Sequence, residues 1–231
     1  TIQATVKANA TAGFSIITYT GNGSTNQTIG HGLNSKPSLI IIKSRDNARN
    51  WVVIPTFIND KHFFYLNDTS ELLTGLTAYY GTHTSSVVGI TGSSSGSNSN
   101  TNGEDYLCYA FAPVPGYSAM GTYIGNYSAN GPFVYTGFRP AFLMWKNTTN
   151  SGFNWGIIDS TRGPINYLSR TLNPNATNSE SNRTEADAFD FLSNGFKVRA
   201  SGSNARNQSG STFAWIAFAE NPFQANGGLA R

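Results

Sequence analysis

The sequence has little charge and almost no cysteine. Only 12% of its 231 residues are charged, 15 basic and 12 acidic, and no stretch concentrates lysine or arginine. Because nucleic-acid binding needs a basic patch to neutralise phosphates, we expect no nucleic-acid partner. The single cysteine, Cys108, lies in the apolar run YLCYAF. It therefore predicts a buried structural thiol rather than a disulfide framework or a thiolate metal site.

Long apolar runs are also missing. No stretch approaches the roughly eighteen apolar residues of a membrane-spanning helix, and no charged-then-apolar signal peptide is present. Membrane insertion is therefore not expected. The sequence begins at Thr1 without methionine, which indicates a fragment, a processed product or the ordered part of a longer protein.

Aromatic residues and turn-forming residues are abundant instead. Aromatics make up 13% of the chain and supply burial that a disordered chain lacks. Short β-branched and aromatic runs recur about every ten residues, between turns rich in Gly, Ser, Thr and Asn. This pattern predicts an all-β fold of antiparallel β-sandwiches.

The chain repeats itself at domain length. Residues 13–51 and 116–155 share a glycine-aromatic-serine start, a Tyr-x-Gly-Asn turn, a proline, an apolar run closing on lysine, and an Asn-Trp pair. Pro37 and Pro140 are 103 residues apart, as are Lys43 and Lys146. A repeat of about a hundred residues is the size of a domain and too long for a solenoid unit.

The repeat predicts two tandem, internally duplicated antiparallel β-sandwich domains of jelly-roll or lectin-like type. We place the first copy at residues 13–115 and the second at 116–223. Residues 1–12 are expected to form a linker or edge strand, and 224–231 a C-terminal tail. A single large β-sandwich with an internal pseudo-repeat is the alternative.

Apolar runs of strand length set the expected strands. In the first copy they are 14–20, 28–33, 38–43, 51–54 and 62–66, followed by a hairpin of 87–90 with 106–112. In the second copy they are 121–124, 133–135, 141–146, 155–158, 166–168, 196–200 and 213–219. Polar excursions at 67–86 and 169–188 occupy matching places in the copies and differ in sequence, as recognition loops on a shared scaffold would.

The residues that usually carry catalysis do not converge. His31 lies between two glycines and predicts a turn or bulge, and His62 a half-buried structural imidazole. Carboxylate pairs do not recur between the copies, so the paired acids of a glycosidase are not expected. Calcium could use Glu185, Asp187 and Asp190, but without an Asp-x-Asp-x-Asp-Gly loop a solvated acidic loop is preferred. The sequence predicts no enzyme, cofactor or metal site.

Aromatic residues in polar loops are the best ligand-binding candidates. Trp51, Trp145, Trp155 and Trp215 belong to the repeat or to apolar strands and are expected in the core. Tyr79, Tyr80 and Tyr127 lie in polar loops instead. There a flat ring can stack on a sugar while Asn and Ser side chains bind its hydroxyl groups.

Three segments carry a family resemblance: GPFVYTGFRPAFLMWK (131–146), DFLSNGFKVR (190–199) and AFAENPF (217–223). The chain resembles a duplicated β-domain family near the C-terminus of tail-fibre or lectin-like virion proteins, from tailed phages of marine and freshwater bacteria. The resemblance implies a structural or adhesion module on the outer surface of the virion, with no catalytic residues. It also implies a homo-oligomer, a trimer above all, among other virion proteins.

Three functions follow from this resemblance. The first is a fibre or receptor-binding domain whose excursions touch a host-surface glycan. The second is a capsid decoration, head fibre or filament-building subunit that binds no glycan. A polysaccharide depolymerase is a minor third.

Overall fold

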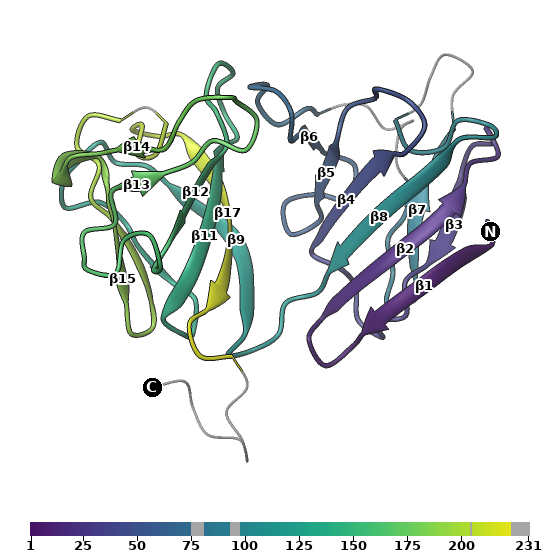
Figure 1. Ribbon diagram of the computed structural model, residues 1–231, viewed down its shortest axis with the longest axis horizontal. Coiled ribbons are helices and arrows are strands. Elements are labelled where there is room, and N and C mark those ends of the chain that lie inside the picture. The colour runs from purple at the N-terminus through teal and green to yellow at the C-terminus, as the bar shows by residue number, and fades with distance from the viewer. Residues whose placement is uncertain (75–80, 93–97, 204, 223–231) are drawn as a thin grey trace. The chain divides into compact units, whose positions relative to one another are not determined.

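The computed structural model describes residues 1–74, 81–92, 98–203 and 205–222 and confirms the predicted all-β fold. Its strands form several antiparallel sheets, and the described residues contain one short 3-10 helix, η1 (Glu185–Asp187). The chain divides into two compact units (Figure 1). Unit 1 comprises Thr1–Asn67 and Leu73–Pro113, and unit 2 comprises Asp68–Leu72 and Val114–Arg231.

Unit 1 holds a six-stranded sheet of order β1-β2-β8-β4-β5-β6 and a two-stranded sheet of β3 and β7 (Figure 1). β1 is the edge strand of the larger sheet. The strands are β1 (Ala4–Asn9), β2 (Phe14–Thr20), β3 (Gln27–Gly30), β4 (Leu39–Ser44), β5 (Val52–Pro55), β6 (Phe64–Tyr65), β7 (Val87–Ile90) and β8 (Asp105–Phe111).

One core lies between these two sheets. β2 alternates, so that Ile17 and Tyr19 point inward, and the Tyr19 ring stacks on Tyr106 with centroids 5.2 Å apart. Ile29 from the smaller sheet joins the same buried cluster. Cys108 is fully buried in it, and burial raises the pKa of its thiol. The predicted structural thiol is therefore confirmed.

The predicted hairpin between residues 87–90 and 106–112 is wrong. β7 pairs with β3, with Val88 opposite Ile29, whereas β8 lies between β2 and β4. β8 therefore has no free edge for β7. The prediction assumed that strands adjacent in sequence are also adjacent in the sheet. The long segment between β7 and β8 instead lets the chain cross from one sheet to the other.

Unit 2 contains three antiparallel sheets, ordered β12-β11-β17-β9, β10-β16-β15 and β13-β14. The first two enclose a core in which Trp145, Phe189, Phe196 and Trp215 pack against one another. The strands are β9 (Ser118–Ile124), β10 (Phe133–Tyr135), β11 (Pro140–Asn147), β12 (Gly156–Asp159), β13 (Arg170–Thr171), β14 (Ser181–Asn182), β15 (Phe189–Leu192), β16 (Gly195–Val198) and β17 (Thr212–Ala219).

Two local predictions in this unit need correction. Residues 166–168 do not form a strand, because only Leu168 makes a single bridge, to Phe189. β15 was not predicted, since its acidic residue interrupts a short apolar run. Its partner β16 was predicted at 196–200 and lies at Gly195–Val198. Among the tryptophans, Trp145, Trp155 and Trp215 are buried as predicted, and Trp51 is half-buried.

A buried asparagine, Asn207, links two segments at one end of the β12-β11-β17-β9 sheet in unit 2. The Asn207 Nδ2 donates to Asn126 Oδ1, Ser128 O and Ala200 O at 3.1, 3.0 and 2.7 Å. Its Oδ1 accepts the Asn126 N–H at 2.9 Å. The side chain thus joins the turn after β9 to the loop between β16 and β17.

Unit 1 contains the same arrangement. The Asn100 Nδ2 donates to Asn22 Oδ1 and Ser24 O, and its Oδ1 accepts the Asn22 N–H. In both units a buried tyrosine hydroxyl then donates to the carbonyl one residue before the asparagine: Tyr19 to Ser99, and Tyr123 to Arg206. The sheet order β2-β8-β4-β5 recurs as β9-β17-β11-β12.

Replacing Asn207 by alanine is expected to destabilise the protein by about 3 kcal/mol, because several buried backbone and amide groups lose partners at once. Urea unfolding of Asn207→Ala measures the change. Asn182→Ala is the control: this asparagine is exposed, its Oδ1 accepts a hydrogen bond from Ser169 Oγ, and the change should cost less than about 0.5 kcal/mol. Equal effects in the two variants would contradict the structural role of Asn207.

Candidate functional site

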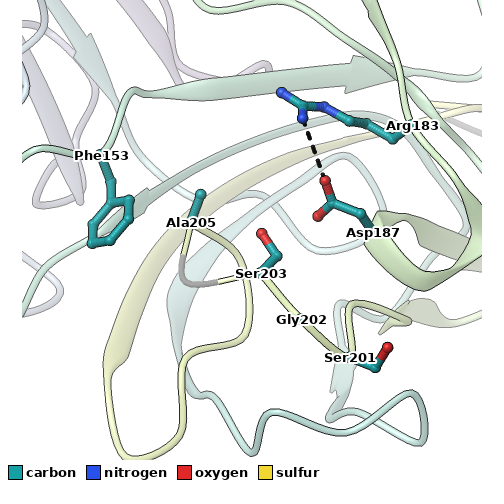
Figure 2. A pocket seen from close by; sticks show the side chains of 7 residues that line it. All are labelled: Phe153, Arg183, Asp187, Ser201, Gly202, Ser203 and Ala205. Atoms are coloured by element: carbon teal, nitrogen blue, oxygen red, sulfur yellow. Dashed lines mark ion pairs between the residues drawn. The ribbon is translucent and has the colours of Figure 1, made fainter.

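Unit 2 carries an open hollow of about 430 Å³ on its loops. Figure 2 shows the side chains around it. Phe153 comes from the turn between β11 and β12, and Arg183 and Asp187 come from the predicted excursion 169–188. The remaining lining residues belong to the loop between β16 and β17: Ser201, Gly202, Ser203 and Ala205.

Two arginines hold Asp187 in place. Its backbone N–H donates to Thr184 O at 2.9 Å within η1, and its carboxylate is paired with Arg206 and, at 3.6 Å, with Arg183. The Arg206 side chain also donates to Thr171 Oγ1 at 3.0 Å and lies over the Trp145 ring at 5.2 Å. One wall of the hollow therefore carries the Asp187 carboxylate, which the buried Arg206 holds in position.

Burial governs the charge of Arg206. The residue is 3% exposed, and this desolvation lowers the pKa of its guanidinium, while the Asp187 carboxylate opposes the shift. Arg183 lies at the outer end of the same network, with its side chain 41% exposed. The Asp187 carboxylate therefore balances the charge of the buried Arg206. The three side chains together carry one net positive charge, and the exposed Arg183 places it at the rim of the hollow.

A buried lysine fixes the turn that carries Phe153. Lys146 is fully buried, and its Nζ donates to Phe153 O at 2.7 Å and Thr69 O at 3.3 Å. Burial lowers the pKa of Lys146 to about 8, and Asp68 and Glu71 oppose this shift. In unit 1, Lys43 at the corresponding repeat position likewise donates to the carbonyls of Ser44 and Asn47.

The lining of the hollow suits binding of a polar ligand. The described residues around it offer one carboxylate, one guanidinium, two serine hydroxyls and a phenyl ring. A hydrolytic site of the paired-acid type needs a second carboxylate across the bond to be cleaved, and these lining residues supply only Asp187. The geometry favours recognition of hydroxyl groups, with Phe153 offering an apolar surface.

Of the tyrosines predicted from the sequence, Tyr127 does not line this hollow. Tyr127 is 45% exposed in the turn after β9, with φ of 57°, and its N–H donates to Asn207 O at 2.8 Å. It is accessible to a ligand but is not among the lining residues. Tyr79 and Tyr80 lie outside the described residues.

The acidic cluster matches the expected solvated loop at Glu185 but not at Asp187 and Asp190. Asp187 is paired with Arg206, and Glu185 and Asp190 pair with Arg199 at 2.6 and 3.2 Å. The Glu185 side chain is 60% exposed, whereas those of Asp187 and Asp190 are partly buried, and their arginine partners compensate for the lost solvation of these two carboxylates. Within the described residues, no group of three or more His, Cys, Asp or Glu side chains could hold a metal ion.

His31 and His83 have structural partners. In unit 1, His31 Nδ1 accepts the Leu33 N–H and His83 Nδ1 accepts the Gly89 N–H, so each Nε2 carries the proton toward a backbone carbonyl, Thr84 O or Asp60 O. Burial lowers the pKa of both, that of His83 to about 4. His62 is half-buried, as the sequence indicated.

The residues that sequence reasoning missed are Phe153, Arg183 and the serines of the loop between β16 and β17. Their types are common in polar loops, so composition did not distinguish them. A usable signal was the spacing of Arg183 and Asp187, which lie four residues apart in the excursion.

An all-β protein with antiparallel sheets and a polar, loop-built hollow is thus defined. No helix in the described parts of the chain is long and apolar enough to cross a membrane. The chain belongs to the family described as "Domain of unknown function (DUF7483)", which matches residues 1–222. No curated protein and no solved structure matches the chain.

Acid is expected to destabilise unit 1 through His83. Because the fold holds the neutral imidazole, its contribution is complete above pH 6.5 and is lost as the pH falls from 6.5 toward 4. The loss should be about 3 kcal/mol. Urea unfolding across this range measures it. His83→Gln keeps a donor and an acceptor without titrating, and an unchanged pH dependence in that variant would refute the assignment.

Arg206 and Arg183 are expected to differ in their contribution to stability. Arg206→Ala leaves Asp187 without its buried partner and should cost about 3 kcal/mol. Arg183→Ala removes only the exposed member of the network and should cost less than about 1 kcal/mol. Thermal and urea unfolding of both variants test this order, and a reversed order would show that the pair does not anchor the hollow.

Proposed function

We propose that the chain is a non-enzymatic module of a virion's outer surface, a fibre or receptor-binding domain that displays loops for adhesion to a host-surface glycan. The hollow in unit 2 carries this proposal. The excursion 169–188, selected from the sequence as a recognition loop, supplies two of its lining residues. Carboxylate, guanidinium, hydroxyl and aromatic groups around an open hollow match the hydroxyls and apolar faces of a sugar.

We further propose that the two units are duplicated, tandem β-sandwiches of one ancestral domain. The support comes from buried contacts and strand order that the two units share. The asparagine side chains, the tyrosine hydroxyl bonds and the order of four strands recur between the units. Such a fixed interior with variable loops is the usual basis of a recognition scaffold.

The virion setting rests on the resemblance of the second copy to tail-fibre and lectin-like proteins. In that setting the chain assembles as a homo-oligomer, a trimer above all, with other virion proteins. A capsid-decoration or filament subunit without glycan binding would leave the hollow without a ligand.

Filling the hollow tests the proposal. The Cβ of a residue at position 202 would meet nothing within 4 Å, and the backbone there does not require glycine, so Gly202→Trp should fold while its indole occupies the hollow. We expect the native chain to bind a subset of a glycan array and Gly202→Trp to lose at least tenfold in affinity.

Gly30→Trp is the matched control, because Gly30 lies in unit 1 and its added Cβ is equally free of neighbours. It should bind as the native chain does. An array without binding by the native chain would refute glycan adhesion, whereas equal binding by Gly202→Trp would refute the hollow as its site.

A further inference from the structure

Two aromatic rings stand exposed on β10, away from the hollow's lining. Phe133 and Tyr135 are 48% and 68% exposed, whereas Val134 between them is 8% exposed and joins the core. Because side chains alternate along a strand, both rings lie on the solvent face, about 7 Å apart along β10. Core packing explains Val134 but not its two neighbours.

The surroundings of the rings keep them accessible. A Cβ on Gly195, opposite Tyr135 on β16, would lie 3.0 Å from Phe133 Cζ and 2.1 Å from Val134 O. The missing side chain thus leaves room for the Phe133 ring to extend across β16. Gly137 lies beside Tyr135, and a Cβ there would approach its ring to between 3.6 and 3.8 Å.

The edge of β10 is open along the same residues. Val198 N–H donates to Pro132 O and Thr136 N–H to Asn194 O, so Val134 is the strand residue whose backbone faces β16. The N–H and C=O groups of Phe133 and Tyr135 point outward, and no hydrogen bond joins them to another described residue. In unit 1, by contrast, Ile2 N–H donates to Thr28 O on β3.

The charged side chains around the rings have fixed partners. Lys197, opposite Phe133, donates from Nζ to Asn130 Oδ1 at 2.7 Å and Gly131 O at 3.2 Å. On its other side, Asp190 is the register partner of Lys197 and pairs with Arg199. A ligand on this surface therefore meets apolar ring faces and a polar rim that includes the Lys197 ammonium, whose hydrogen bonds go to two neutral acceptors.

The size of the surface decides its occupant. Two aromatic side chains contribute at most about 150–250 Å² each, below the roughly 800 Å² that each partner buries in a stable protein interface. A linear polysaccharide needs less, since the C–H faces of its sugar rings can stack on flat aromatic rings while hydroxyls reach the rim and the open backbone groups.

We propose that Phe133 and Tyr135 form a second carbohydrate-binding surface, which stacks the rings of a neutral linear polysaccharide. This inference rests on the proposed glycan-binding function and adds the substrate class: a polymer whose chain lies along β10. Binding should persist in about 1 M salt, where the Debye length is only about 3 Å, because no ion pair holds the ligand.

Native affinity electrophoresis of the full chain tests the surface, with glucomannan, galactan and dextran as neutral polymers and alginate as the acidic one. The native chain should be retarded by at least one neutral polymer. Phe133→Ala and Tyr135→Ala should each weaken this about tenfold, and the double variant should abolish it. Ile165→Ala, which removes another exposed apolar side chain of unit 2, should leave it unchanged.

Several results would overturn the proposal: no retardation of the native chain by a neutral polymer, retardation by alginate alone, loss in high salt, or full retardation of the double variant. A change in oligomeric state of the double variant, seen by sedimentation, would instead assign the rings to a contact between copies. If glycan-array binding remains sensitive to Gly202→Trp in any of these cases, the proposed function stands and only the β10 surface fails.

Discussion

The amide of Asn207 is the contact on which unit 2's loop architecture depends. Its side chain binds the turn after β9 and the carbonyl of Ala200, so both ends of the loop between β16 and β17 are held to the sheet. That loop supplies most of the hollow's lining, and Arg206 directly precedes the asparagine. Around Asn207, a loop made largely of Gly, Ser and Asn is held to its neighbours because a buried donor and acceptor are satisfied there.

The buried charge of Arg206 places a second constraint on the same loop. Burying a guanidinium requires a counterion, and Asp187 meets that requirement from a different segment. The ion pair consequently ties the excursion 169–188 to the loop between β16 and β17. Asp187 thus pairs with the buried Arg206 and also lines the hollow, so this acidic loop residue is held in a fixed position.

The sequence predicted the strands best where burial sets a strict pattern. β2 and β10 begin and end where their apolar and aromatic residues predicted. It failed where pairing depends on distant segments, as for β7, and where a strand carries a charge, as for β15 with Asp190. The hollow was predictable only as an excursion, because folding rather than spacing brings Arg206, the buried partner, to Asp187.

The two units show how one interior can support different surfaces. Inward positions on β3 and β10 carry Ile29 and Val134, since each must fill a core, but outward positions are free of that requirement. β3 bears Thr28 and Gly30 there, and the N-terminal residues pair along it. β10 bears Phe133 and Tyr135 at its outward positions. Exposed aromatic rings bring no folding benefit comparable to burial, so stability alone does not account for their place on an open strand.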